Sequence, residues 1–413
     1  MHDVVVVGAG PTGCYAAREL ARLGYEVLVL EEHSEIGEPV HCTGIIGVEA
    51  CQRFEVDASC IESQLSSARF FSPGGQSFRV AAEEPQAVVV DRSRFDRILA
   101  EQALSAGASF LLGARAESVT VEPDRVLVSG ACFGEPVAFR SSMLIVATGA
   151  DDAITQQIGV ARRSGPMISG AQLITESGDL DEVEVHFGRG VAPNGFAWAV
   201  PVVERVGAQH AVPVLSACCA RTSNLESRTS NLDRVRVGLV CQGRPGPLLR
   251  RFAAGLERRG AIRRNGARVR ARAVPSGPRT PSFGERTLVI GDAAGQVKAT
   301  TSGGVYYGLL GAEAAVAAAD RALQSGDVSC HSLSAYEDQW LSRLGGEQRT
   351  GRVLRHIHRS LTDRDMDALF WLARRTGLPR MLSRLRFDWH TSGVLALLWQ
   401  QAVGAVDQSR LLR

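Results

Sequence analysis

Lysine is almost missing from this 413-residue chain, in which Lys298 is the only lysine among 46 basic residues. So uniform a preference for arginine is most simply a coding bias of the source genome, and a single arginine therefore carries little functional weight. Position 298 is the exception, so a lysine there is expected to have a chemical reason. The basic residues meet 44 acidic ones, and the formal net charge of +2 excludes a globally basic nucleic-acid coat protein. We therefore expect no nucleic-acid partner.

Long apolar runs and paired cysteines are also missing. No run reaches the roughly 18–20 residues that a membrane span needs, and residues 4–7 near the N-terminus predict a strand, so we expect no signal peptide there. Nine cysteines stand at irregular spacings without a CxxC pair, so we expect reduced thiols, a cytoplasmic location and no metal site. The composition, 45% hydrophobic and 22% charged, is that of an ordinary globular protein.

A dinucleotide fingerprint opens the chain. Residues 3–31 predict a buried strand, a glycine turn, a helix and a second strand, with the turn reading Gly8, Ala9, Gly10, Pro11, Thr12, Gly13. The first glycine allows the tight turn, the second lets the backbone approach a pyrophosphate, and the third lets helix and strand pack closely. Glu31, with Glu32 after it, ends the second strand, where a carboxylate can accept hydrogen bonds from ribose hydroxyls.

Three later segments also consist of a predicted buried strand followed by a residue that could contact the cofactor. Arg92 follows the strand 88–90, Gly149 follows the strand 143–147, and Gly291 with Asp292 follows the strand 287–290. No second GxGxxG is present, which does not favour a reductase with separate FAD and NAD domains. Electrons would then come from NAD(P)H bound transiently or from a reduced carrier protein.

Together these segments resemble the glutathione-reductase-type FAD fold, in its para-hydroxybenzoate-hydroxylase-like branch. The resemblance implies an α/β fold: a Rossmann-like FAD-binding domain, an antiparallel-sheet substrate domain and a helical C-terminal region. It also implies that Arg92 lies near the FAD phosphates, that Asp292 holds the ribityl chain and that Gly149 borders the cofactor.

Residues 291–311, GDAAGQVKATTSGGVYYGLLG, resemble the geranylgeranyl reductase family. Gly303 and Gly304 are expected to open a helix that runs to about residue 320, with its N–H groups directed at the flavin. Ala299 and Ser302 replace a proline and a glycine of the family pattern, and both are small. Lys298 either adds a positive charge near the flavin or lies on the loop surface.

Residues 191–201 are similar to the family's Pro-x-Gly-Tyr-x-Trp-x-Phe-Pro signature, with Phe196 in the tyrosine position. The resemblance implies that Phe196, Trp198 and Pro201 line the substrate pocket, joined by Tyr306. Trp198 would offer a flat apolar wall to a prenyl chain, and the alternative is a tryptophan in the core of the second domain.

Residues 35–44 resemble the family's Gly-x-Pro-Val-x-Cys segment, which lies near the reactive side of the flavin. Cys42 is then a cofactor contact and, with Trp198, a candidate catalytic residue. Free cysteine thiols have a pKa of about 8.5 and are mostly protonated at pH 7, so Cys42 could supply the proton that alkene reduction needs. The alternative is a buried structural thiol.

The expected FAD-binding domain is discontinuous and comprises residues 1–60, 85–160 and 280–325. Residues 61–84 form an excursion toward the substrate domain, which comprises residues 161–279. Residues 326–413 form the helical C-terminal region, with helices expected at 333–344 and 363–375. Residues 216–233 predict a polar loop, and residues 394–406 predict a packed terminal helix or a membrane-surface anchor.

The resemblance implies an FAD-dependent oxidoreductase that reduces isoprenoid C=C bonds of a prenyl lipid, a prenyl diphosphate or a prenylated quinone. The alternatives are an FAD-dependent monooxygenase or halogenase, and an electron-transfer flavoenzyme that reduces a quinone. Residues 244–286 carry a cluster of arginines, and the C-terminal region is also basic. These stretches form solvated faces, or they dock on an anionic membrane at its cytoplasmic side or on an acidic electron carrier.

Overall fold

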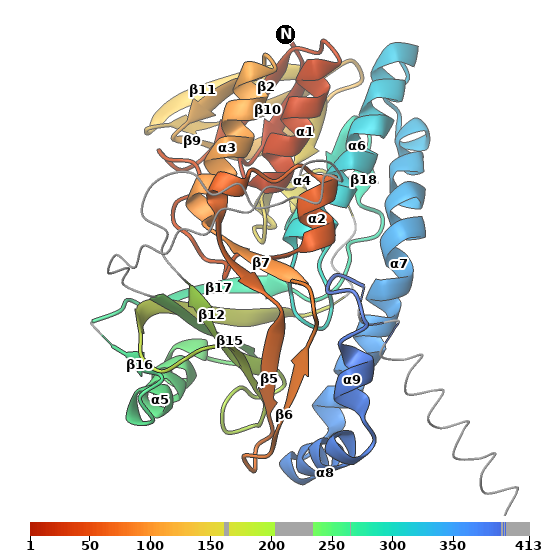
Figure 1. The fold of residues 1–413 in the computed structure, drawn as a ribbon. Helices are drawn as coiled ribbons and strands as arrows, with labels where there is room; N and C mark the ends of the chain where they lie inside the picture. The colour runs from red at the N-terminus through yellow and green to blue at the C-terminus, as the bar shows by residue number, and fades with distance from the viewer. Residues whose placement is uncertain (161–164, 203–233, 265, 390, 392, 394–413) are drawn as a thin grey trace, which may run out of the picture.

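The computed structural model describes residues 1–160, 165–202, 234–264, 266–389, 391 and 393. The polar loop expected at 216–233 and the terminal helix expected at 394–406 lie outside these residues. Figure 1 shows a sheet with helices at one end of the molecule, a second large sheet at the other end, and one long helix that runs beside both. The α/β fold predicted from the sequence is confirmed.

The first sheet is Rossmann-like, and its strand order is β18-β19-β11-β1-β2-β8. The strands β1, β2, β8, β11 and β19 pair in parallel, while β10 pairs antiparallel with β11 and with β9. Parallel strands are covered on both faces and therefore read as continuous apolar runs, as the N-terminal valines do. The bounds are β1 His2–Val7, β2 Val27–Glu31, β8 Ser109–Leu112, β9 Ala114–Val121, β10 Val126–Cys132, β11 Glu135–Val146, β18 Phe283–Gly284 and β19 Thr287–Val289.

Helices cover one face of this sheet, and the β9–β10 ribbon with a short helix covers the other. The three helices that share the first core are α1 (Pro11–Arg22), α3 (Arg92–Ser105) and α6 (Val305–Ser325). The short helix is α4 (Ala153–Gln157), and α2 (Val48–Arg53) and the 3₁₀ turns Ala58–Cys60 and Gly291–Ala294 connect the strands. Helix α6 continues five residues beyond the end expected at residue 320, because its left-handed C-cap is Gly326.

The second large sheet has the order β16-β12-β15-β14-β13-β5-β6, with β17 paired to β12. All its pairs are antiparallel except β13 with β5. Helix α5 (Pro245–Arg258) packs on one face, and a small sheet, β3-β7-β4, lies toward the other. The bounds are β3 Ile45–Gly47, β4 Ile61–Leu65, β5 Ser67–Phe71, β6 Ser77–Ala81, β7 Ala87–Val90, β12 Met167–Ser177, β13 Val183–His186, β14 Phe196–Val202, β15 Arg234–Cys241, β16 Ile262–Arg263 and β17 Arg270–Pro275.

The C-terminal helices connect the two layers. Helix α7 (Cys330–Ser360) runs along both, and α8 (Asp363–Arg375) and α9 (Leu378–Leu382) contact β6 (Figure 1). The expected helix 363–375 matches α8, which begins with a Thr362–Asp365 capping box. The expected helix 333–344 is only part of α7. Its buried glycines, such as Gly351, do not end the helix, and they let the loop at Ala299 pack closely against it.

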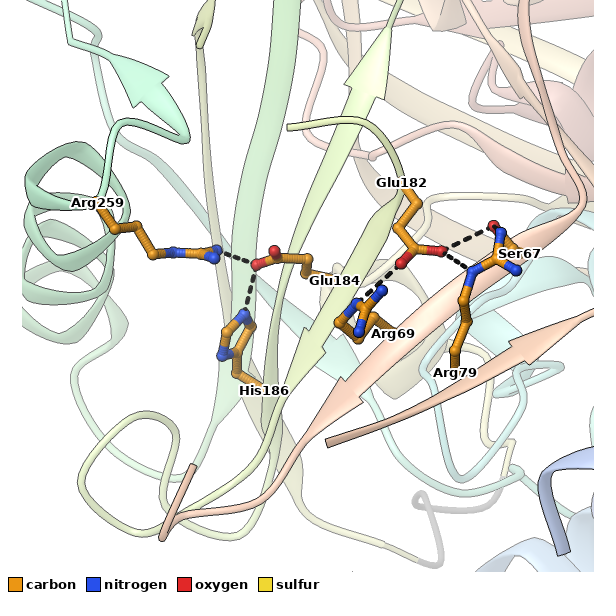
Figure 2. Close-up of polar contacts among 7 residues, drawn as sticks. All are labelled: Ser67, Arg69, Arg79, Glu182, Glu184, His186 and Arg259. Atoms are coloured by element: carbon orange, nitrogen blue, oxygen red, sulfur yellow. Dashed lines mark hydrogen bonds and ion pairs between the residues drawn. The ribbon is translucent and has the colours of Figure 1, made fainter. Parts of the chain in front are cut away.

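Glu182, just before β13, and Glu184, on β13, tie this strand of the second sheet to its surroundings (Figure 2). Glu184 is 7% exposed and binds the Nε2 of His186 at 2.8 Å and the guanidinium of Arg259. Burial alone would raise the pKa of Glu184, but the hydrogen bonds from His186 and Arg259 outweigh it and hold that pKa below its usual value. Glu184 is therefore ionised in the folded protein and stabilises it above the pKa of an unfolded glutamate.

Replacing Glu184 with glutamine is expected to lower the free energy of unfolding by about 1.5–3 kcal/mol at pH 7, which is the usual value of hydrogen bonds to a charged group. The deficit should begin to shrink as the pH falls below about 4.5, because the unfolded carboxylate then takes up a proton, and it should vanish only below the lowered pKa of the folded protein. Urea unfolding at pH 7 and pH 4 measures this. An equal deficit at both pH values would contradict the assignment.

Candidate functional site

The glycine turn after β1 is closed toward the protein and open toward a ligand. Gly8 has a φ of +108°, and a Cβ there would lie 2.4 Å from the carbonyl oxygen of Ala147. A Cβ at Gly13 would lie 2.0 Å from the carbonyl oxygen of Gly8. Gly10, by contrast, has no atom within 4 Å of such a Cβ, and Pro11 after it begins α1. Gly10 therefore leaves room beside the start of α1, where the N–H groups of a helix end can bind an anion.

Thr12 connects this turn to the loop that follows β19. A Cβ at Gly291 would lie 2.8 Å from Thr12 Oγ1, and one at Gly308 would lie 2.4 Å from Thr12 Cγ2. In the same loop, a Cβ at Gly304 would lie 2.3 Å from Asp292 Oδ1. The structure thus brings together predicted cofactor residues that are almost 280 positions apart in the sequence.

Glu31 and Glu32 have different surroundings. Glu31 Oε2 accepts a hydrogen bond from the Ala9 N–H at 2.8 Å, and Oε1 accepts one from the His33 N–H at 3.0 Å. The Glu32 side chain is 48% exposed, and its nearest cation is Arg115 at 3.8 Å. Glu31 therefore lies at the rim of the glycine turn, whereas no contact joins Glu32 to the turn among the residues that the structure describes.

The loop 298–304 is closed by its own backbone. The N–H of Lys298 donates to the carbonyl oxygen of Gly303 at 3.0 Å, and the N–H of Ser302 donates back to the carbonyl of Lys298 at 2.8 Å. Ser302 has a φ of +61°, so it adopts the conformation of the glycine that it replaces. The loop-surface alternative for Lys298 is wrong, because its side chain is 6% exposed and forms a buried ion pair with Asp388.

Helix α7 holds the preceding part of this loop. Gln348 donates to the carbonyl oxygen of Gly295 at 2.9 Å, and Arg355 donates to that of Ala299 at 3.0 Å. The side chain of Gln296 turns back and accepts from the N–H of Gly291 at 2.7 Å. Sequence analysis missed these side chains, since glutamine and arginine on a helix do not reveal which backbone carbonyls they bind.

Cys42 lies beside Arg92 at the start of α3. The guanidinium of Arg92 binds the carboxylate of Asp96 at 3.0 and 2.9 Å and also contacts the side chain of Cys42. Burial alone would lower the pKa of Arg92, but Asp96 and then Cys42 outweigh it and raise that pKa. The Cys42 sulfur accepts a hydrogen bond from the N–H of Gly44 at 3.3 Å. The predicted residues Cys42 and Arg92 are therefore neighbours.

Arg236, which sequence analysis did not single out, anchors the Cys42 loop. Its guanidinium donates to the carbonyl oxygens of Thr43 at 2.6 Å and Val90 at 2.9 Å, and it forms an ion pair with Glu62. Arg236 is 7% exposed and comes from β15. In the sequence, a charged residue inside an apolar strand could have indicated this role. The chain contains so many arginines that this one did not stand out.

A second arginine of the second large sheet reaches the end of β11. A Cβ at Gly149, whose φ is +66°, would lie 2.4 Å from the Nη2 of Arg272 on β17. Burial first, and then the charges of Arg272 and Arg270, lower the pKa of His41. Residues of both layers therefore meet where Gly149 and His41 lie close to Arg272.

Strand β14 carries the aromatic pair of the predicted pocket. The rings of Phe196 and Trp198 are 5.6 Å apart, and Trp198 lies over its cross-strand partner Gly238, where a Cβ would be 2.3 Å from the indole. Pro201 falls on the opposite face of the strand, because side chains alternate and Ala197 packs toward α5. The structure therefore does not bring Pro201 together with Phe196 and Trp198.

Tyr306 is also apart from this pair. It is 4% exposed in the core of the first layer, where its hydroxyl donates to Glu49 Oε1 at 2.9 Å and its ring contacts Trp389. Sequence analysis missed this environment because Glu49 and Trp389 are far from Tyr306 along the chain. Its contact with a substrate stays a prediction.

Buried polar atoms without a partner test whether the residues fit a flavin. They include His41 Nδ1, Trp198 Nε1 and Ser302 Oγ, one on each of the three segments that the sequence places beside the cofactor. An unsatisfied buried polar group costs about 1–3 kcal/mol, so such groups fit a ligand with many hydrogen-bonding atoms. With the open glycine turn, these residues fit FAD. Among the described residues, no cluster of His, Cys, Asp and Glu is arranged to hold a metal ion.

Comparison with known proteins points the same way. Residues 1–187 match the FAD binding domain family. The chain is 31% identical over 397 residues to digeranylgeranylglycerophospholipid reductase 2 of Methanothermobacter thermautotrophicus, covering 89% of this chain and 90% of that protein. The crystal structure of a geranylgeranyl bacteriochlorophyll reductase-like protein from Thermoplasma acidophilum superposes with a TM-score of 0.80 at 22% identity, covering 100% and 99% of the two chains. A flavin-dependent brominase superposes with a TM-score of 0.66 at 17% identity, covering 99% of each chain, which shows the shared fold alone.

Proposed function

This chain belongs to the digeranylgeranylglycerophospholipid reductase family, and from that membership and the site described above we propose that it is an FAD-dependent reductase of prenyl C=C bonds in a lipid. The similarity over nearly the whole of both chains carries the proposal. The aromatic pair Phe196 and Trp198 supports it, because flat apolar rings suit a prenyl chain. A halogenase or monooxygenase shares the fold, but fold alone does not fix function.

Different residues would bind the pyrophosphate and the flavin ring of the cofactor. Bound FAD in its reduced form supplies a hydride for one carbon of the double bond, and a proton must reach the other carbon. Gly8, Gly10 and Gly13 with the end of α1 would hold the pyrophosphate, and the loop 298–304 with the start of α6 would favour negative charge on the flavin ring. Electrons come from NAD(P)H bound transiently or from a reduced carrier protein.

An anaerobic turnover experiment tests the function. The purified protein is reduced with dithionite and mixed with digeranylgeranylglycerophospholipid, while flavin absorbance and the product mass are followed. We expect the flavin to reoxidise as the product gains two mass units per reduced bond. A flavin that stays reduced until oxygen is admitted would contradict the proposal and favour the oxygenase alternative.

Cys42 is proposed to deliver the proton, directly or through a water that it positions. The support is its place beside Arg92 in a loop that Arg236 anchors to the strand end at Val90. Cys42→Ala is expected to bind FAD as the wild type does and to lower kcat by about 10²-fold or more, the lower end of the usual contribution of a general acid. Full alkene reduction by a variant that retains FAD would contradict this role. Cys132→Ala, at a half-buried thiol on β10, is the matched control.

We also propose a peripheral contact with the cytoplasmic face of a membrane, made by the outer side of α8. Leu369, Trp371 and Leu372 are each about half exposed there, at 47, 50 and 48%. The guanidinium of Arg375 lies 4.3 Å from the centre of the Trp371 ring, and Arg374 next to it is exposed. An apolar patch with tryptophan and arginine complements an anionic bilayer. Within the described ranges, no helix is long and apolar enough to cross one.

Vesicle binding checks this contact. The protein is expected to sediment with phosphatidylcholine vesicles that contain phosphatidylglycerol, less with phosphatidylcholine alone, and less at high salt. Replacing Trp371 and Leu372 with serine should weaken binding at least tenfold. Phe133→Ser is the matched control, since Phe133 is 74% exposed between β10 and β11. Unchanged binding of the double variant, or its loss only on removal of residues 394–413, would overturn the assignment to α8.

A further inference from the structure

The only lysine of the chain forms a buried ion pair. Lys298, 6% exposed, pairs with Oδ1 of Asp388, 3% exposed. The ammonium also lies 4.4 Å from the centre of the Phe387 ring, and the backbone carbonyl of Asp388 accepts from the hydroxyl of Tyr307 at 3.1 Å. Burial lowers the pKa of Lys298, and the carboxylate of Asp388 opposes that shift. The carboxylate of Glu347 opposes that shift as well, so both carboxylates favour the charged form of Lys298.

The chemistry of this pocket explains why the chain departs from arginine here. Arginine carries five N–H donors in a rigid fork, whereas lysine presents three donors on one compact head. The described surroundings of Lys298 Nζ include an oxygen of Asp388 and two aromatic rings, and the buried Glu347 carboxylate also acts on its charge. A buried guanidinium would need partners for all five of its donors, and each unsatisfied donor would cost free energy.

The pair joins the C-terminal region to the loop beside Asp292. Because the backbone of Lys298 bonds to Ser302 and Gly303, the position of Lys298 sets where Gly304 lies, and Gly304 is the N-cap of α6. Asp388 belongs to the segment after α9, and its other carboxylate oxygen, Oδ2, has no partner and abuts Gly47, where a Cβ would lie 1.9 Å away. Asp388 thus lies between the loop that carries Lys298 and the segment that carries Gly47, and both segments border the proposed FAD site.

We propose that Lys298 and Asp388 are positioning residues that hold the loop 298–304 and the start of α6 against FAD and that offset each other's charge there. This inference rests on the FAD placement given under the proposed function. Loss of the pair frees the loop and weakens FAD binding. Loss of one partner leaves an uncompensated charge beside the flavin as long as the remaining group stays ionised.

Three variants separate these effects without any prenyl substrate. Asp388→Asn leaves Lys298 alone, Lys298→Met leaves Asp388 alone, and the double variant Lys298→Met/Asp388→Leu removes both charges. The apolar double variant should fold, since packed apolar residues can replace a buried ion pair at little cost. FAD affinity is measured by titrating the apoprotein and following flavin fluorescence, and the flavin midpoint potential is measured by anaerobic titration from pH 6 to pH 9.

We expect the double variant to bind FAD at least tenfold more weakly than the wild type, with an unchanged pH dependence of the potential. Asp388→Asn should raise the potential at pH 6, and this shift should fade as unpaired Lys298 loses its proton at higher pH. Lys298→Met should lower the potential, because it leaves the negative charge of Asp388 unpaired.

Wild-type FAD affinity in the double variant would overturn the positioning role, even if both single variants failed to fold. Shifts of the same sign in the two single variants would overturn the electrostatic role. FAD affinity and the midpoint potential do not depend on turnover. These two measurements therefore test the roles of Lys298 and Asp388 even if the protein does not reduce prenyl chains.

Discussion

Gly13→Ala is expected to abolish FAD binding. The new Cβ would lie 2.0 Å from the carbonyl oxygen of Gly8 and 3.3 Å from the Cβ of Ala147. Backbone atoms cannot move aside as a flexible side chain can, so α1 must shift away from β1 and carry its N-terminal N–H groups with it. Flavin content after purification and urea unfolding of the apoprotein measure the effect. We expect no bound flavin and a loss of stability of about 2 kcal/mol or more, as in overpacked cores.

Two other glycines provide the controls. At Gly10 a Cβ meets no protein atom within 4 Å, so Gly10→Ala should leave the apoprotein as stable as the wild type and still weaken FAD binding. Gly346, exposed in α7, also has open space, and alanine there should keep both FAD and stability. If Gly13→Ala retained a full complement of FAD, the close approach of helix and strand would not be essential.

Arg236→Met is expected to lower the free energy of unfolding by about 3–5 kcal/mol, the usual cost of removing one member of a buried ion pair. Glu62 would lose its cation, and burial already raises the pKa of that carboxyl group even with Arg236 present. The carbonyls of Thr43 and Val90 would also lose their donor. Thermal and urea unfolding measure the loss, and flavin content shows whether the Cys42 loop is displaced.

The double variant Arg236→Met/Glu62→Leu should recover much of this stability, since no unpaired charge is left. Arg250→Met, at an exposed arginine of α5, is the control for the loss of one arginine and should cost less than about 0.5 kcal/mol. A cost of that small size at Arg236 would show that its three contacts do not stabilise the fold.

The local patterns of this chain predict its fold well. The strand–turn–helix unit at residues 2–31 and the helix 363–375 depend on contacts between near neighbours, such as the closing of Gly8 on Gly13 and the Thr362–Asp365 cap. The resemblance of short motifs identified the family for the same reason, because these motifs keep their residue spacing.

The parts that sequence analysis missed depend on distant partners. Nothing in the residues around Lys298 reveals that Asp388 is its counter-ion, ninety positions later. Arg236 is one of many arginines until Glu62 and Thr43 are placed beside it. Pro201 belongs to the pocket motif by sequence, yet strand alternation turns it to the other face of β14. Long-range pairing and the face of a strand require the folded structure.

The hydrogen bonds from α7 to the loop after β19 have a consequence for the order in which the protein folds. Strand β1 is synthesised long before β19 at residues 287–289, and the helix that carries Gln348 and Arg355 follows later still. Contacts between such distant segments form late and slowly. The parallel sheet of the nascent chain therefore stays incomplete until β19 has been synthesised.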